Sequence, residues 1–277
     1  MTARLEQPKN AACESAPSPA RRRHRAPRET TPMPTRRLRA SWLLACPLFL
    51  LLAGAALQDG HVPDRGDGAF LFAYRPRPGM DATFEEGYRR HLGWHESRGD
   101  TLAWLAWTVV SGPGMGLFVD GVFGIPFRAM DERVDPGGDA ADAAANVTAF
   151  GDPAYLHAYR LRRDLGSATR LERARPAAMQ KVVWLTVRAG SEAAFEDALA
   201  GLTRPRREGL DYAVYERVAG GVEPGYLLAV QVAAFAELED EAADPTGAIL
   251  RAAGSAVVRA EAELWRYRPD LTYIPKR

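Results

Sequence analysis

The chain has 277 residues, of which 47% are hydrophobic and 26% are charged, a composition typical of globular proteins. Its net charge of +1 is unevenly distributed, because ten of the 36 Arg and Lys residues but only three of the 35 acids lie in residues 1–40. The remainder therefore has 26 bases, 32 acids and a net charge of about −6. Since an acidic body has no general attraction to nucleic acid or anionic lipid, nucleic-acid binding is not expected.

The beginning of the chain has the pattern of an export signal. Residues 1–32 are rich in Pro, Arg, Ala and Ser, and we interpret them as disordered or as an over-extended start before Met33. Residues 33–55 combine a basic stretch, an apolar run interrupted by Pro47, and an Ala-x-Ala cleavage site that ends at Ala55. This run is shorter than the roughly 20 apolar residues of a membrane anchor. We therefore expect cleavage, no stable membrane insertion afterwards, and a periplasmic or secreted protein.

The remaining chain contains two diverged copies of one unit of about 105 residues. Gly79-x-x-x-x-Phe84-Glu85 recurs as Gly190-x-x-x-x-Phe195-Glu196, and the Asp-Pro pair at 135–136 recurs at 244–245. The two copies also end alike, in Arg160-Leu-Arg162-Arg-Asp164-Leu165 and Arg266-Tyr-Arg268-Pro-Asp270-Leu271. The matches keep their order, with offsets of 111, 109 and 106 residues, which indicates duplication. The predicted units are residues 69–166 and 180–271, and the shared ending predicts a structural ion-pair role.

Both copies are predicted to have the element order β-α-β-β-α-β. For the first copy the predicted strands are 69–74, 102–110, 117–123 and 159–165, and the predicted helices are 81–97 and 140–147. For the second copy the strands are 182–187, 212–218, 226–232 and 263–268, and the helices are 192–202 and 246–260. We expect Asp81 to cap the first helix and the glycine-rich run 111–116 to form a hairpin turn.

This element order is that of the ferredoxin-like fold. The predicted strand 102–110 is apolar on both of its faces: Leu102, Trp104 and Ala106 alternate with Leu105, Trp107 and Val109. A four-stranded sheet with helices on one face would leave its other face in water, so we expect the second copy to cover it. The predicted fold class is α+β, with two tandem ferredoxin-like units packed sheet to sheet as a pseudo-dimeric barrel.

Such an arrangement resembles the dimeric α+β barrel superfamily, which includes antibiotic-biosynthesis monooxygenase-like, NIPSNAP-like and chlorite-dismutase-like proteins. The resemblance covers Ala69 to Arg268 and rests on topology and repeat order. No catalytic motif of a member is matched, so no functional residue is transferred. The resemblance implies a binding cavity between the helices and the sheet of a unit, in a group where some members are enzymes without cofactors and others bind haem.

The two copies differ most on their first helix. Tyr88 and His91 stand where the second copy has Leu199 and Leu202, and helical spacing places His95 on the same face. Burying such polar groups without partners costs roughly 1–3 kcal/mol each. The face is therefore either a polar-lined pocket or a core whose hydrogen bonds are satisfied, and the sequence leaves both interpretations open.

Further candidates lie on the predicted hairpin. Asp120 is the only charge in the apolar run 117–123, and it aligns with Ala229 of the second copy. It is a candidate general base or an orienting partner of His91. The alternatives are an exposed edge position or hydrogen bonds accepted from backbone groups. Trp104 and Trp107 could line a site for a flat ligand, with ordinary core packing as the alternative.

The spacing His91-x-x-x-His95 also fits a helical metal pair, but no third ligand can be named from the sequence. Both cysteines precede the cleavage site, so the mature chain would have no thiolate ligand or nucleophile. Accordingly, neither a metal site nor a cofactor is predicted, and haem with His91 as its axial ligand is kept as an alternative.

The best-supported function from the sequence is the binding of a small, partly aromatic molecule by the first unit. We expect His91 and Asp120 as catalytic candidates in such a pocket, and the ligand-binding candidates are Tyr88, His95, Trp104 and Trp107. A cofactor-independent monooxygenase or a haem enzyme in the same pocket is one alternative, and a non-catalytic structural protein is another. The sequence leaves the oligomeric state open.

Overall fold

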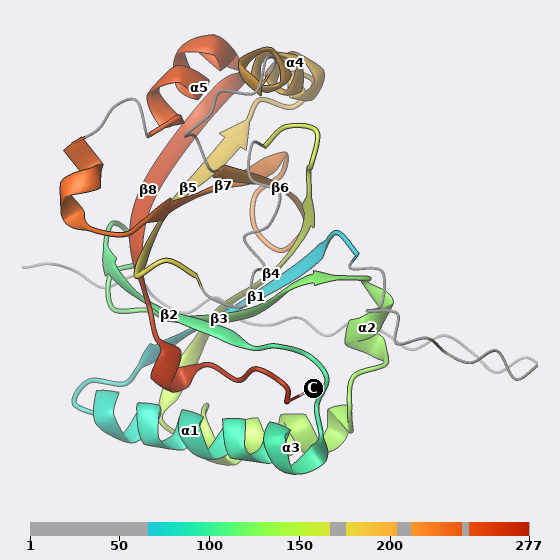
Figure 1. Cartoon of the computed structure of the whole chain (residues 1–277), viewed down its shortest axis with the longest axis vertical. Helices are drawn as coiled ribbons and strands as arrows, with labels where there is room; N and C mark the ends of the chain where they lie inside the picture. Colours follow the sequence, from blue (N-terminus) through green and yellow to red (C-terminus); the bar gives the residue numbers. More distant parts are fainter. Residues whose placement is uncertain (1–65, 167–175, 204–211, 240–243, 277) are drawn as a thin grey trace, which may run out of the picture. The chain divides into compact units, whose positions relative to one another are not determined.

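The computed structural model describes residues 66–166, 176–203, 212–239 and 244–276 (Figure 1). The predicted disordered start at 1–32 and the export signal at 33–55 lie outside the described residues. All described residues belong to the unit Gln58–Arg277. Among the helices of these residues, none combines the length and the apolar character needed to span a membrane.

The first half of the unit follows the predicted element order. Its strands are β1 (Gly68–Pro76), β2 (Leu105–Ser111), β3 (Phe118–Ile125) and β4 (Gly151–Leu161). Its helices are α1 (Asp81–Arg98), the short α2 (Arg128–Asp131) and α3 (Pro136–Asn146). The prediction that Asp81 caps α1 was wrong. Met80 occupies the N-cap position and makes no side-chain hydrogen bond there. Asp81 lies in the first turn, where its negative charge interacts favourably with the helix dipole.

The second half repeats this order. Its strands are β5 (Met179–Val187), β6 (Tyr212–Ala219), β7 (Gly225–Val232) and β8 (Val257–Tyr267). Its helices are α4 (Glu192–Thr203) and α5 (Thr246–Ala253), with the short 3₁₀ segments η1 (Phe235–Glu239), η2 (Gly254–Ala256) and η3 (Pro269–Leu271). The helix predicted to reach residue 260 ends at Ala253, because Gly254 has a φ of 51° and the β-branched Val257 and Val258 begin a longer β8.

The eight strands form one closed barrel of antiparallel pairs, in the order β1-β3-β2-β8-β5-β7-β6-β4. Within each half the strand order is the same, β4-β1-β3-β2 in the first and β8-β5-β7-β6 in the second. The halves meet where β2 pairs with β8 and where β4 pairs with β6. The two sheets are therefore joined edge to edge into one barrel, which leaves no unpaired edge among these strands.

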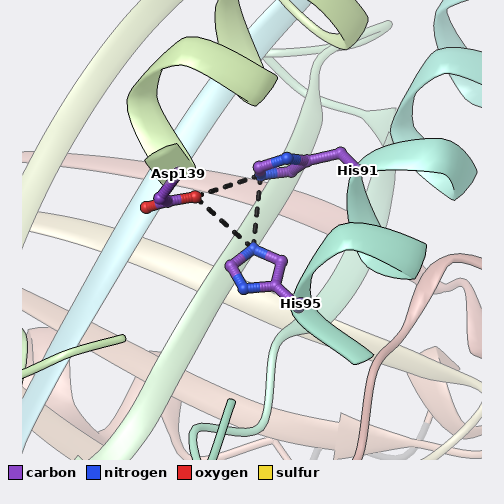
Figure 2. Close-up of side chains that lie close together, drawn as sticks. All are labelled: His91, His95 and Asp139. Atoms are coloured by element: carbon purple, nitrogen blue, oxygen red, sulfur yellow. Dashed lines mark hydrogen bonds and ion pairs between the residues drawn. The ribbon is translucent and has the colours of Figure 1, made fainter. Parts of the chain in front are cut away.

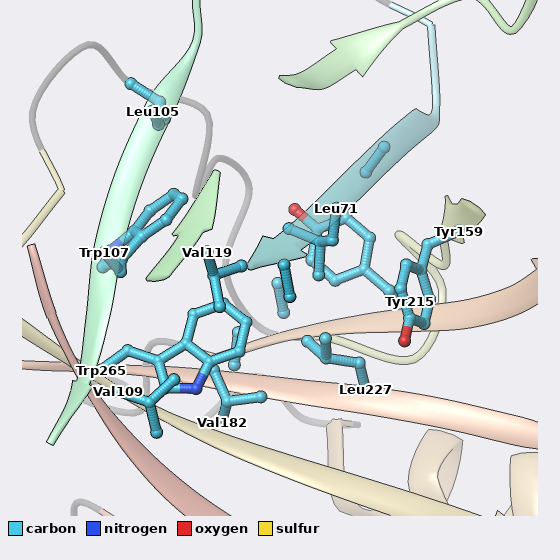
Figure 3. Close-up of a cluster of buried hydrophobic side chains, with 14 of the residues drawn as sticks. Leu71, Leu105, Trp107, Val109, Val119, Tyr159, Val182, Tyr215, Leu227 and Trp265 are labelled. Atoms are coloured by element: carbon cyan, nitrogen blue, oxygen red, sulfur yellow. The ribbon is translucent and has the colours of Figure 1, made fainter. Parts of the chain in front are cut away.

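The inner face of the barrel is filled with side chains from all eight strands (Figure 3). The alternation predicted for residues 102–110 is confirmed, since Leu105, Trp107 and Val109 belong to this interior cluster, whereas Leu102 and Trp104 pack on the outer face. The outer face is covered by α1 and α3 on one side of the barrel and by α4 and α5 on the other (Figure 1). Each helix pair thus forms its own core with the sheet beneath it.

The segment that follows the last strand of each half forms ion pairs with the other half. Arg162, after β4, binds Asp164 and also Glu196 of α4, with Nη2 2.9 Å from Glu196 Oε2. Arg268, after β8, binds Asp270 and also Glu85 of α1, with Nη2 2.8 Å from Glu85 Oε2. These contacts confirm the predicted structural role of the repeated ending.

The leucine that ends each repeated segment is buried in the core of the other half. Leu165 is 2% exposed and belongs to the cluster beneath α4 and α5, in the second half. Leu271 is fully buried in the cluster beneath α1, in the first half. Each half therefore completes the helix–sheet core of the other, and burial of one leucine contributes about 1.5–3 kcal/mol.

Helix α1 approaches α3 closely at a glycine. A Cβ atom built on Gly87 would lie 1.9 Å from the backbone oxygen of Asn146, at the end of α3. Only a residue without a side chain allows this approach, which brings the acids of α3 to the histidines of α1. Gly93, in the same helix, has no atom within 4 Å of such a Cβ.

These two glycines form a matched pair for a test. We expect Gly87→Ala to lower the free energy of unfolding by about 1–3 kcal/mol, because α3 must move away. We expect Gly93→Ala to raise it by about 0.5–1 kcal/mol, through the better helix propensity of alanine. Urea unfolding of both variants measures the difference, and effects of the same sign at the two positions would contradict the close approach of α3.

Candidate metal centre

Helix α1 turns one polar face toward the barrel, as predicted. Phe84, Tyr88, His91 and His95 are all buried, at exposed fractions between 0% and 7%. Phe195 and Leu199 of α4 occupy the corresponding buried positions in the second half, which supports the alignment of the two helices. The imidazoles of α1 therefore lie where the second half has an apolar core.

Three ligand-type atoms converge between α1 and α3 (Figure 2). His91 Nε2 lies 3.3 Å from His95 Nε2, and Oδ1 of Asp139, in the first turn of α3, lies 3.5 Å and 3.6 Å from these two nitrogens. We call His91 Nε2, His95 Nε2 and Asp139 Oδ1 the ligand triangle. The side chains are 9%, 3% and 15% exposed, so the triangle is largely shielded from water.

The size of the ligand triangle matches a transition-metal ion. A point equidistant from its three corners lies about 2.0 Å from each, and zinc binds imidazole nitrogen and carboxylate oxygen at about 2.0–2.2 Å. A tetrahedral ion with such bonds also requires ligand–ligand distances of about 3.3–3.5 Å. The corners are therefore spaced as an ion would need them without movement of the helices.

A carboxylate orients each imidazole through its other nitrogen. Asp142 Oδ2 lies 2.8 Å from His91 Nδ1, and Asp100 Oδ2 lies 2.8 Å from His95 Nδ1. If the Nδ1 atoms donate to these carboxylates, both Nε2 atoms present a lone pair to the triangle. This is the arrangement that orients metal-bound histidines in proteins.

Burial of His91 and the hydrogen bonds to Asp100 favour this protonation pattern. Burial lowers the pKa of His91, although the hydrogen bond with Asp142 opposes the shift, and the neutral imidazole is the form that binds a metal. Burial alone would raise the pKa of Asp100, but hydrogen bonds from His95, the backbone of Leu102 and the indole of Trp104 lower it overall. The carboxylate behind His95 is thereby kept ionised.

Asp120 does not orient His91, contrary to one of the predicted roles. It accepts a 2.7 Å hydrogen bond from the hydroxyl of Tyr88, while the partner of His91 is Asp142. Both groups of the Tyr88–Asp120 pair are buried, and Asp120 Oδ1 has no hydrogen-bond partner among the described residues. Burial raises the pKa of Asp120 to about 7, against the opposing hydrogen bond from Tyr88.

The predicted counterpart of Asp120 was wrong by one residue. Asp120 pairs with Phe72 of β1, and the equivalent pair in the second half is Leu228 with Val183. Ala229 belongs to the barrel interior, on the opposite face from the helices. Because side chains alternate along a strand, an error of one residue reverses the face. Asp120 is therefore a buried carboxyl where the second half has Leu228, just as Tyr88 of α1 stands where α4 has Leu199.

The two candidate tryptophans lie on opposite faces of the sheet. Trp104 packs on His95, with ring centroids 5.0 Å apart, and its indole donates to Asp100. Trp107 lies inside the barrel, with its ring centroid 6.0 Å from that of Trp265 (Figure 3). Trp104 therefore belongs to the candidate centre, whereas Trp107 does not share a site with Tyr88 and Asp120.

Four residues of the centre were missed by the sequence analysis: Asp100, Asp139, Asp142 and Tyr273. Asp139 and Asp142 are spaced three residues apart in an Ala-rich helix that has no buried residue, and this spacing was the available signal. The Tyr273 hydroxyl donates to the backbone oxygen of Asp100, at 2.8 Å, and its ring stacks on His95. Since Tyr273 comes from the segment after β8, the second half contributes to a centre built on the first.

Comparison with known proteins gives no match to a family model and none to a curated protein. Solved structures do match. A candidate monooxygenase from Lactobacillus acidophilus is 9% identical, with a TM-score of 0.50, over 73% of this chain and 94% of that one. One from Fusobacterium nucleatum is 10% identical, with a TM-score of 0.50, over 75% and 97%. A variant chlorite dismutase from Candidatus Nitrospira defluvii is 9% identical, with a TM-score of 0.49, over 74% and 92%.

At these identities the likeness concerns the fold alone. It agrees with the antiparallel eight-stranded barrel and its flanking helices, and the fold is a ferredoxin-like α+β barrel.

The buried Asp120 carboxyl makes a pH-dependent prediction. The pKa of Asp120 is raised from 3.8 to about 7 in the folded state, so ionisation of this carboxyl opposes folding. The free energy of unfolding therefore falls by roughly 1.4 kcal/mol for each pH unit between these two values. Asp120→Asn removes the charge and can still accept from Tyr88. The variant should match the wild type near pH 4 and exceed its unfolding free energy by about 2–4 kcal/mol at pH 8. A difference that stays constant from pH 4 to pH 8 in urea unfolding would contradict this assignment.

Proposed function

We propose that this protein binds one divalent transition-metal ion at His91, His95 and Asp139 and is a metal-dependent enzyme acting on a small molecule. The observation that supports the proposal is the ligand triangle, whose corners are equidistant from a point at bonding distance while both imidazoles are oriented by carboxylates. Sequence reasoning could supply two of these ligands, and the fold supplies the third.

The donor set favours an ion with reactive coordination positions. Two imidazoles and one carboxylate are found in catalytic zinc sites and in non-haem iron(II) sites, and three protein ligands leave room for water or a substrate oxygen. Such an ion would polarise that oxygen. Arg133 Nε lies 3.3 Å from Asp139 Oδ2, the oxygen outside the triangle, so this side chain helps to hold the carboxylate in place.

The haem alternative is less well supported at His91. An axial ligand needs open space on the far side of its nitrogen for the porphyrin plane, but His95 Nε2 and Asp139 Oδ1 lie 3.3 Å and 3.5 Å from His91 Nε2. These atoms suit a single ion better than a macrocycle. A Soret absorption band in the purified protein would reverse this preference.

We also propose that the two halves arose by tandem duplication and imitate a homodimer within one chain. Three features support this: the equal strand order of the halves, the two matching Arg–Glu contacts, and the exchange of Leu165 and Leu271. Export remains our proposal from the pattern of residues 33–55, so the metal would be acquired or retained outside the cytoplasm.

Metal titration tests the proposed centre. The purified, metal-stripped protein should bind one Zn²⁺ per chain, and Co²⁺ should give the visible absorption of a low-symmetry site. A hundredfold excess of zinc over its Kd should raise the free energy of unfolding by about 2.7 kcal/mol. His95→Ala and Asp139→Asn should abolish stoichiometric binding, whereas Asp142→Asn, which alters only an orienting carboxylate, should weaken it about 10- to 100-fold.

The controls are a histidine and an acid of the same kinds elsewhere. His157→Ala changes a partly buried histidine inside the barrel, and Asp81→Asn changes a first-turn acid of α1. Both variants should bind zinc as the wild type does. Substoichiometric binding by the wild type, or equal affinity in the Asp139→Asn variant, would rule out the proposed centre.

A further inference from the structure

A second group of polar and aromatic side chains lies inside the barrel, beside the turn between β6 and β7. It consists of inward-facing residues from three strands, which we call the barrel-end cluster: Tyr155, His157 and Tyr159 of β4, Trp184 of β5 and Arg217 of β6. The ligand triangle lies under α1 on the outer face of the sheet, so the barrel-end cluster is a separate place in the fold.

Arg217 is the cation of this cluster, and no carboxylate among the described residues pairs with it. Its guanidinium carbon lies 5.7 Å from the ring centroid of Tyr159 and 5.8 Å from that of Trp184. Its polar contacts are the backbone oxygen of Val222, at 2.7 Å, and the Tyr159 hydroxyl, at 3.4 Å. Within the described ranges, every other partly buried Arg or Lys has a carboxylate within 4.0 Å, whereas Arg217 has none.

The cluster also contains a buried hydroxyl without a hydrogen-bond partner. Tyr155 Oη is inaccessible to water and has no partner among the described residues. The Tyr155 ring stacks on His157, with centroids 4.3 Å apart, and Trp184 meets both rings edge-on, at 5.9 Å and 5.6 Å. An unpaired buried donor costs about 1–3 kcal/mol, so a hydroxyl kept here indicates an acceptor that the described residues do not provide.

Arg217 and the buried Glu263 carboxylate are the charges that act on both tyrosines of the cluster. Glu263 already accepts hydrogen bonds from the backbone of Gly114 and the indole of Trp265, whereas Arg217 has no carboxylate partner among the described residues.

Burial, and next the charge of Arg217, lower the pKa of His157 to about 4, so this imidazole is neutral near pH 7 and Arg217 is the cation of the cluster. Nδ1 of His157 lies 3.1 Å from the Tyr159 hydroxyl. A carboxylate would accept from the guanidinium, as planar carboxylates do in charge-assisted pairs, and from the free hydroxyl.

We infer that the barrel-end cluster binds a small aromatic carboxylate, whose anionic group pairs with Arg217 and the Tyr155 hydroxyl and whose ring stacks among Tyr155, His157 and Trp184. Trp184 and Tyr155 are partly exposed, so the cluster reaches the surface at this end of the barrel. The Tyr155 hydroxyl itself is covered, so a bound carboxylate must displace the atoms that cover it. The adjacent turn includes Gly220 and Gly221, both with positive φ. Because these residues have no side chain, the backbone of the turn lies directly on His157 and Arg217.

Equilibrium binding of benzoate tests the inference, with tryptophan fluorescence and calorimetry as readouts. The wild type should bind benzoate saturably, and about tenfold or more tightly than benzamide, which lacks the charge, or acetate, which lacks the ring. Arg217→Gln should weaken benzoate binding at least about tenfold. Arg266→Gln, at an exposed arginine of β8 without a carboxylate partner among the described residues, should leave it unchanged.

Tyr155→Phe separates a ligand role from a packing role. Because the hydroxyl has no partner within the described part of the chain, the variant should keep or increase its melting temperature while losing about five- to tenfold in benzoate affinity. This result also decides the matter if Arg217→Gln fails to fold. The inference would be overturned if binding did not saturate by about 20 mM benzoate. It would also be overturned if folded Arg217→Gln and Tyr155→Phe variants bound benzoate as tightly as the wild type.

Discussion

The fold depends on an exchange between its two halves. Neither four-stranded section closes alone, because β2 finds its outer partner in β8 and β4 finds its own in β6. The exchange continues past the strands, where Arg268 binds Glu85 and Leu271 enters the core beneath α1. A sheet with two apolar faces is thereby shielded on both, by helices outside and by the opposite strands inside.

The same frame supports different chemistry in each half. Beneath α4 the core is apolar, whereas beneath α1 it contains two imidazoles and the Asp120 carboxyl. Acids from α3 and from the segment before β2 contact the imidazoles, and the Tyr88 hydroxyl donates to the carboxyl. Helix α3 has no buried residue, so its polar contacts and the approach at Gly87 determine where it lies. The candidate centre therefore also helps to hold α3 against the barrel, so the binding of a metal ion there would also stabilise the position of α3.

The sequence was sufficient for the order of elements, the repeated ending and the buried face of α1, because these depend on periodicity and on motifs that both copies retain. It was insufficient where a shift of one residue changes the face of a side chain, or where a contact depends on a segment distant in the chain. The counterpart of Asp120 was misplaced because strand alignment is sensitive to a shift of one residue. Asp139 and Asp142 were missed because their partners lie about 50 residues away, on a helix whose distance is set by Gly87. Trp107 was grouped with Trp104 for one site although the predicted alternation of the strand already placed the two side chains on opposite faces.

We propose that α1 and α3 together form a metal site in the first half of the fold. X-ray absorption spectroscopy of the zinc-loaded protein tests it most directly, because it reports the ligand atoms themselves. We expect one ion with two imidazole nitrogens and at least one carboxylate oxygen at about 2.0–2.1 Å. A first shell without imidazole scattering, or one that is unchanged when His91 is replaced by the leucine of the second half, would contradict it.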